Sequence, residues 1–427
     1  MNTASSKRKH SNKSKQNKHK LKTKSSKADA VDTQREAFIK AKIRKLNNAL
    51  DSDPVNVDLL RKLMISNEGC VTNDIRCKVW PKLLNINIFT VPRKKKADVE
   101  LKEFQENRWW HQVNLDVKRS HRRFPFDTRL SRKRVLQHQL TSIIMRVLCR
   151  NPDLNYYQGY HDIAVTLLRV LGEDLATAAL DQLSKTHIRD FMDKNMNRTN
   201  KMLSFFYAVI GKADVELEQF LLRSDVGTIF ALSWLITWYG HDLNGFDLIV
   251  RLCDLFLATH PVMPVYVAVA LVLTHKNQVL ERECDMAMVH HCLCRLPTYI
   301  GVDEIESLIS KSYELYQAHP PETLRAEVRK YIRESDSISQ HAELIYQSYN
   351  QRPDSILRRR KKHGRLFSES SRQVSISGSD IVASGGESGA LIKHEVNPMV
   401  KVAVWAMTVS MGVMTYFVLN THRYLNF

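Results

Sequence analysis

Three short stretches of this 427-residue chain bring charged, amide and aromatic side chains together at spacings that could do chemistry. Arg76 and Trp80 lie in RCKVWPKLL, Asp116 and Arg119 in VNLDVKR, and Gln158 in NYYQGYHD. A planar guanidinium can bridge two oxygens of an anion, and a neutral amide can donate one hydrogen bond while it accepts another. These residue types therefore permit the binding of an anion such as a phosphate, with an amide beside it.

Each stretch also has a structural explanation when it is taken alone. An Arg and a Trp four residues apart on a helix are typical of a packing pair, and tyrosines commonly fill a core. Asp116 and Arg119 are three residues apart, the spacing of a surface ion pair that contributes little to stability. Gln158 followed by Gly159 is less typical of a core, because it puts an amide and a conformationally permissive residue at the start of a helix.

In chain order, the three stretches resemble the fingerprint motifs of the TBC domain of Rab GTPase-activating proteins: R-x3-W-x2-L-L, I-x2-D-x2-R and Y-x-Q-G. Val113 stands where the family prefers Ile, Ser120 where Thr is usual, and Pro125 falls later than in the commoner form. The RSHRRFP and YYQGYHD forms and an apolar C-terminal segment are similar to a subfamily anchored in the endoplasmic reticulum, which acts on Rabs of the early secretory pathway. The resemblance implies an all-α TBC domain and a function in vesicle trafficking.

The same resemblance implies the roles of individual residues. Arg119 and Gln158 would be catalytic, supplied in trans to a Rab in its GTP form as a cation and as a substitute for the water-positioning glutamine of the Rab. Supporting roles in the scaffold or in partner binding fall to Asp116, Tyr157, Gly159, Arg76 and Trp80. The chain would be an activator and not a stand-alone hydrolase, with no cofactor or metal of its own, because the Rab carries GTP and Mg²⁺.

A catalytically silent, Rab-binding membrane scaffold is the alternative function. The presence of both Arg119 and Gln158 favours the activator, because a protein that only binds has no use for either side chain.

Apolar residues recur every three or four positions, which predicts an all-α fold. Asp53–Pro54 predicts the start of a helix that stops near Gly69, and Ser131 the start of one that ends at Asn151–Pro152. An apolar helix is expected over Tyr160–Leu171, before Gly172. Further helical segments are predicted at 175–183, 202–210, 215–222, 229–238 and 246–257, and the apolar run at 264–273 is predicted to be a core helix.

Composition and pattern divide the chain into six parts. They are a disordered basic tail at 1–30, an N-terminal helical extension at 31–68, the TBC domain at 69–316, a C-terminal helical extension at 317–350, a basic and Ser/Gly-rich linker at 351–399, and a transmembrane tail anchor at 400–421.

The formal charge of +19 is unevenly distributed, since residues 1–27 contain ten Lys or Arg and no acidic residue. A second basic cluster, RRRKK at 358–362, is either a solvated part of the linker or a segment that is attracted to an anionic membrane or nucleic acid. Because no nucleic-acid recognition module accompanies these charges, no specific nucleic acid is expected.

The segment Val402–Thr421 has 20 residues without a charge, enough for a helix of roughly 30 Å that spans a bilayer. Trp405 near one end and Tyr416 and Tyr424 near the other are typical of interfacial anchors. We expect a tail-anchored protein whose domain faces the cytosol. The segment's length suits the thin membrane of the endoplasmic reticulum, with the mitochondrial outer membrane as the alternative.

The seven cysteines, without a signal peptide, indicate reduced thiols. Five potential metal ligands lie close together in sequence: Cys284, His290, His291, Cys292 and Cys294. They lack a C-x2-C pair and fall in a helical pattern, so no metal site is predicted.

Overall fold

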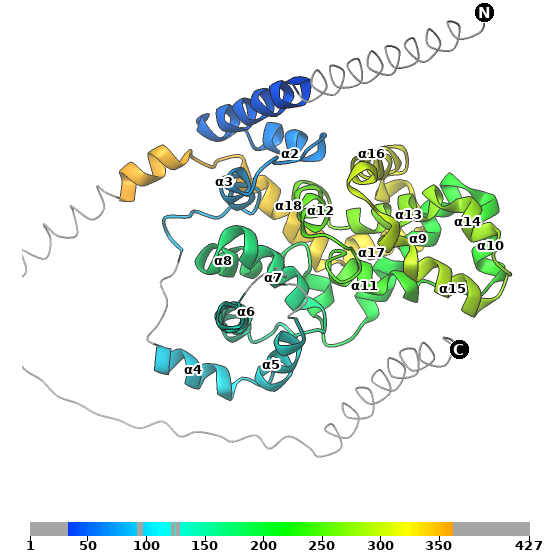
Figure 1. The fold of residues 1–427 in the computed structure, drawn as a ribbon, viewed down its shortest axis with the longest axis horizontal. Coiled ribbons are helices and arrows are strands. Elements are labelled where there is room, and N and C mark those ends of the chain that lie inside the picture. The colour runs from blue at the N-terminus through cyan, green and yellow to red at the C-terminus, as the bar shows by residue number, and fades with distance from the viewer. Residues whose placement is uncertain (1–32, 92–96, 121–123, 125–128, 362–427) are drawn as a thin grey trace, which may run out of the picture. The chain divides into compact units, whose positions relative to one another are not determined.

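The computed structural model describes residues 33–91, 97–120, 124 and 129–361. Within those ranges the chain forms α-helices, short 3-10 turns and loops, without a strand (Figure 1). The all-α prediction is confirmed for this part of the chain. The predicted basic tail at 1–30 lies outside it, as does the linker beyond residue 361. So does the predicted anchor at 400–421, and among the described residues no helix has the length and apolarity that a membrane crossing requires.

The helices follow one another from a first helix at 33–51 to a last one at 354–361. Between them lie α2 (Val57–Ile65), α3 (Asn73–Leu83), α4 (Ala97–Glu106), α5 (Trp110–Arg119), α6 (Leu130–Arg150), α7 (Tyr160–Leu171), α8 (Glu173–Lys185), α9 (Asn197–Ala213), α10 (Val215–Arg223), α11 (Leu232–Ile236), α12 (Phe246–Ala258), α13 (Met263–Thr274), α14 (Lys276–Leu280), α15 (Met286–Arg295), α16 (Val302–Ala318), α17 (Ala326–Glu334) and α18 (Asp336–Ser348). The 3-10 turns are η2 (Arg189–Met192), η3 (Ile229–Ala231), η4 (Leu296–Tyr299) and η5 (Pro321–Thr323).

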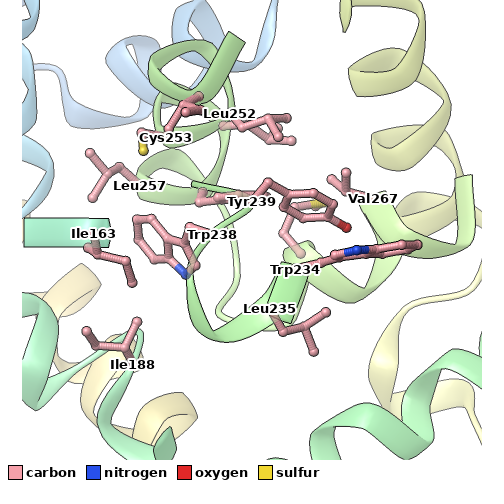
Figure 2. Packing of buried hydrophobic residues seen from close by; sticks show 14 of the residues in the cluster. Ile163, Ile188, Trp234, Leu235, Trp238, Tyr239, Leu252, Cys253, Leu257 and Val267 are labelled. Atoms are coloured by element: carbon pink, nitrogen blue, oxygen red, sulfur yellow. The ribbon is translucent and has the colours of Figure 1, made fainter. Parts of the chain in front are cut away.

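The apolar run predicted as a core helix is α13, which packs against α9 and α16 and is buried along residues 263–272. An aromatic cluster lies beside it. Figure 2 shows Trp234, Trp238 and Tyr239 with side chains of α12 and with Val267 of α13. The Tyr239 hydroxyl donates to the carbonyl of Pro264 at 3.0 Å, which satisfies its polar end inside the core.

Two predicted helix starts are wrong, while the predicted bounds of α7 are confirmed. α2 is capped by the side chain of Asn56, which accepts from the backbone N–H of Leu59 at 3.0 Å, and not by Asp53. α6 begins at Leu130, before Ser131, and no side chain caps it. The segment predicted as one helix at 229–238 is a 3-10 turn followed by the short α11, and the chain then leaves helical geometry with positive φ at Trp238 and Tyr239.

Residues 351–361 were expected to be linker, but they pack onto the domain. The amide of Gln351 donates to the carbonyl of Lys82 at 2.6 Å, and the buried ammonium of Lys82 lies 2.8 Å from Asp354. Further along, the cations of Arg358 and Lys361 lie over the ring of Phe89. The folded region therefore reaches beyond the predicted boundary at 350, because these contacts anchor the chain that follows α18.

Candidate functional site

Asp116, on the last turns of α5, is the centre of the candidate site. Its side chain is 1% exposed and accepts hydrogen bonds from three residues. Gln112 donates to both carboxylate oxygens at 3.2 Å, the Tyr156 hydroxyl donates at 2.9 Å, and the guanidinium of Arg119 forms the third contact, an ion pair. Three donors offset the cost of burying this charge, so the carboxylate is a fixed point on which Arg119 is held.

Arg119 is held at one end and open at the other. Its side chain is 63% exposed although it pairs with buried Asp116. A weaker contact joins its Nε to the carbonyl of Leu115 at 3.4 Å, and the hydroxyl of Ser120 donates to the Asp116 carbonyl at 2.9 Å. The last turn of α5 is thus held by contacts with the turn before it. The guanidinium keeps donors that face solvent and can bind an anion.

The tyrosines before α7 are interior residues that build the turn carrying Gln158. The Tyr157 hydroxyl donates to the carbonyl of Ile236 at 2.9 Å, and Tyr160 lies 2.6 Å from the hydroxyl of Ser184. Tyr160 also meets the ring of Tyr156 edge-on, with ring centroids 6.0 Å apart.

Burial, together with the neighbouring Asp116 carboxylate, raises the pKa of Tyr156 well above its usual value. Tyr156 therefore stays a neutral hydroxyl that can donate to Asp116 at physiological pH.

Gly159 has a φ of +111°, a conformation that side chains other than glycine rarely adopt. A Cβ placed there would lie 2.9 Å from Cγ2 of Thr237, so the turn also lacks room for one. The structure shows an internal requirement for this glycine, the left-handed turn packed on the end of α11. Gln158, one residue earlier, is exposed, and its amide makes no hydrogen bond within the described residues.

One buried hydrogen bond connects the elements that carry Arg119 and Gln158. It runs from Tyr156 to Asp116 and joins the end of α5 to the turn that carries Gln158 two residues later. The side chains of Arg119 and Gln158 are both exposed. The structure thus joins the elements of the two predicted catalytic residues through Asp116, which also pairs with Arg119.

Arg76 and Trp80 lie inside the bundle and are not part of this network. Both bind Asp254 of α12, which is fully buried: Arg76 forms an ion pair with it at 2.8 Å, and the indole N–H of Trp80 donates at 2.8 Å. The backbone N–H of Cys70 adds a third bond at 3.0 Å. The first motif of the sequence therefore fastens α3 to α12.

Sequence reasoning missed several residues of the two networks. Gln112 lies one helical turn before Asp116, a spacing that could have indicated the bond. Asp254 has no such signal, because it is 178 residues from Arg76. Next to the turn, buried Asp162 has His161 at 3.6 Å and His241 at 3.7 Å, of which His241 comes from a distant loop.

The cysteine- and histidine-containing segment falls mainly on α15. In the part of the chain that the structure describes, no three His, Cys, Asp or Glu side chains converge in a way that could hold a metal ion. Two of the five potential ligands are in contact: the Cys294 thiol lies 3.6 Å from Nδ1 of His290.

Known proteins resemble this chain in sequence. The family model of the Rab-GTPase-TBC domain matches residues 73–280, which include Arg119 and Gln158. "TBC1 domain family member 20" of Mus musculus is 42% identical over 374 residues, covering 87% of each chain, and its Homo sapiens counterpart is 41% identical over the same share.

More distant relatives match a smaller share of the chain. "GTPase-activating protein gyp10" of Schizosaccharomyces pombe is 31% identical over 271 residues, covering 62% of this chain and 71% of that protein. Among solved structures, the Ypt/Rab-GAP domain of Gyp1p aligns with a TM-score of 0.55 and 18% identity, over 66% of this chain and 99% of that one. At this identity the structural likeness shows a shared fold.

Proposed function

Because this chain belongs to the TBC family of Rab GTPase-activating proteins, we propose that it accelerates GTP hydrolysis by a Rab of the early secretory pathway, between the endoplasmic reticulum and the Golgi. Arg119 and Gln158 act in trans on the nucleotide that the Rab carries, and the chain contributes no nucleotide or metal of its own. The name of the GTPase-activating protein gyp10 supports the activator class, and the sequence resemblance supports the choice of pathway.

Arg119 supplies the charge that the reaction requires. Hydrolysis moves negative charge onto the phosphate oxygens, and a guanidinium inserted next to them stabilises that charge in the transition state. Such an arginine is worth roughly 10³ to 10⁵ in rate. The exposed guanidinium on a fixed α5 meets this need, because the buried Asp116 orients it without covering it.

Gln158 supplies the position of the water. Its neutral amide can donate to a phosphate oxygen and accept from the attacking water, and it brings no charge that would oppose the reaction. The amide is exposed on a turn that Tyr157 and Gly159 hold rigidly, so little conformational freedom is lost when a partner binds.

One observation carries this proposal: a buried hydrogen bond between Tyr156 and Asp116 connects two exposed side chains with the chemistry of a cation and a water-positioning amide. A surface ion pair between Asp116 and Arg119 would need neither the burial of the carboxylate nor the tyrosine that reaches it from another element.

We further propose that the chain works at a membrane. The apolar segment at 402–421 would place the domain on the cytosolic face of the endoplasmic reticulum, with the mitochondrial outer membrane as the alternative. Fluorescence microscopy of the tagged full chain against markers of both organelles, with and without that segment, tests this. Loss of either membrane pattern on deletion supports the anchor, and an unchanged pattern contradicts it.

The catalytic proposal is tested by single-turnover hydrolysis with a panel of GTP-loaded Rabs and the full chain, as wild type, Arg119→Ala and Gln158→Ala. We expect acceleration of at least one Rab and its loss in both variants. Arg329→Ala, which removes an exposed cation from α17, is the matched control and should keep the wild-type rate.

If some Rab binds equally well to all three proteins and none accelerates hydrolysis, the chain is a Rab-binding membrane scaffold. Thermal unfolding of each variant establishes that a lost rate is not a lost fold.

A further inference from the structure

The first two turns of α6 and the residue before them expose an unusual set of side chains, which we call the α6 shelf: Arg129, Leu130, Arg132, Arg134 and Val135. Leu130 is 77% exposed and Val135 57%. Within the residues that the structure describes, none of the three arginines pairs with a carboxylate. Two large apolar side chains and three cations without a carboxylate partner in the described part of the chain are thus exposed around the start of α6.

The shelf is unfavourable for the isolated chain. The N-terminus of a helix carries a positive partial charge, which favours acidic residues and disfavours cations. α6 has no acidic residue in its first turn and no side-chain cap. Leu130 and Val135, being exposed, contribute little burial to folding. A bound partner explains this composition better than folding does.

The shelf adjoins the surface of Arg119. α5 packs against α6, as Figure 1 also shows, and the amide of Gln137 on α6 donates to the carbonyl of Val117 at 3.5 Å. On α5, exposed Leu115 lies one helical turn before Arg119 and adds an accessible apolar side chain to that helix.

We infer that the α6 shelf docks an acidic and apolar surface of the GTP-bound Rab, beside its nucleotide. For Arg119 to reach the phosphates, the partner has to lie over the end of α5, so it also covers the neighbouring turns of α6. Arginines complement an acidic surface, and Leu130 and Val135 complement an apolar one. The inference rests on the proposed function, because it takes the Rab as the occupant.

The test is the double variant Arg132→Glu/Arg134→Glu of the full chain, with Arg329→Glu/Lys330→Glu on α17 as a control of equal charge change. Single-turnover hydrolysis is measured against the concentration of chain. We expect the half-saturating concentration to rise at least tenfold in the α6 variant, with the maximal rate within twofold of wild type and no change in the control.

Two further readouts separate docking from folding. The unfolding temperature of the α6 variant should be equal to or above that of the wild type, because carboxylates are favourable at a helix N-terminus. Raising the salt concentration should increase the half-saturating concentration of the wild type more than that of the variant.

The dissociation constant for the same Rab loaded with a non-hydrolysable GTP analogue completes the test. If the α6 variant has the same half-saturating concentration and the same affinity for the Rab as the wild type, the inference is overturned. If the wild type binds a Rab without accelerating hydrolysis and the variant binds at least tenfold more weakly, the docking surface stands and the catalytic proposal fails. If the wild type neither binds nor activates any Rab, both are wrong.

Discussion

Two buried carboxylates in this protein each hold an arginine, with different results. Asp254 is enclosed on all sides: Arg76, its partner, is only 10% exposed, and Trp80 donates a further bond. Asp116 is equally buried, yet its partner Arg119 is 63% exposed. An ion pair between an arginine and a buried aspartate therefore joins two helices in one region. In the other region, the same kind of pair holds an arginine whose guanidinium stays accessible.

The difference shows how a chain can keep an arginine available without losing stability. Removing one partner of a buried ion pair leaves an uncompensated charge, whereas an exposed side chain contributes little. Asp116 has Gln112 and Tyr156 as additional donors, so its burial does not depend on Arg119. Arg119 is thereby free to serve a partner, and Arg76 is not.

The largest expected effect separates the two arginines by stability. Arg76→Ala leaves Asp254 buried without its ion-pair partner, which should cost about 3–5 kcal/mol of unfolding free energy. Urea denaturation followed by circular dichroism measures this against Arg119→Ala, for which we expect less than about 1 kcal/mol. Equal losses of unfolding free energy in the two variants would contradict the difference between the two arginines.

The second effect separates them by activity. Arg119→Lys keeps the positive charge but loses the planar fork that can bridge two phosphate oxygens, so the maximal rate of GTP hydrolysis that the chain stimulates in the Rab should fall roughly 100-fold. Single-turnover kinetics at saturating chain concentration gives this rate, with thermal unfolding as the check on the fold. A lysine variant with the wild-type rate would mean that Arg119 acts only as a point charge.

The third effect probes the connection between α5 and the turn that carries Gln158. Tyr156→Phe removes one of the three donors to Asp116 and should cost about 2 kcal/mol of unfolding free energy, because the bond is to a charged group. The maximal rate should also fall, since α5 and the Gln158 turn lose their link. Tyr346→Phe, on the exposed face of α18, is the matched control. Loss of stability with an unchanged rate would show that the link is only structural.

The smallest effect comes from a third buried region, where histidines meet without a carboxylate. The rings of His187 and His341 lie 4.5 Å apart, with His260 and Arg61 near them. Burial and Arg61 lower the pKa of His187 to about 3, and burial lowers that of His260 to about 4. Burial, together with the neighbouring His187, His260 and Arg61, also holds the pKa of His341 well below its usual value.

These histidines are neutral in the folded chain, and the unfolded chain binds protons more readily. Their contribution to stability is therefore complete above the unfolded pKa near 6.5 and is lost as the pH falls below it, by roughly 0.8 kcal/mol for each histidine at pH 6.0. Urea denaturation across pH 5.5 to 8 checks the slope. His341→Leu should reduce it and the exposed His138→Asn should not; a slope that is equal in all three proteins would contradict this reading.

The sequence predicts the pair of Asp116 and Arg119 better than the pair of Arg76 and Asp254. Arg119, Asp116 and Gln158 stand in short motifs whose spacing is visible in the chain, and the apolar period places α7 correctly. The pairing of Arg76 with Asp254 joins positions 178 residues apart, which only tertiary packing brings together. Local signals therefore could not assign the first motif to a particular partner.

The start of α6 and the C-terminal boundary of the folded region were predicted less well, each for its own reason. α6 begins at Leu130 without the side-chain cap that the prediction relied on. Residues 351–361 have the basic composition of a linker, but Lys82 and Phe89 hold them through long-range contacts. At residues 351–361 the structure is determined by neighbours distant in the chain, which composition does not reveal.

The central claim, that Gln158 and Arg119 act in trans, is tested most directly with a Rab whose own water-positioning glutamine is replaced by alanine. Single-turnover hydrolysis by that Rab is measured with wild-type chain, Gln158→Ala and Arg119→Ala. The account predicts strong acceleration by the wild type and none by either variant, because Gln158 replaces the missing glutamine. If the altered Rab does not respond to the wild-type chain while an unaltered Rab does, the Rab positions its own water and the role of Gln158 is contradicted.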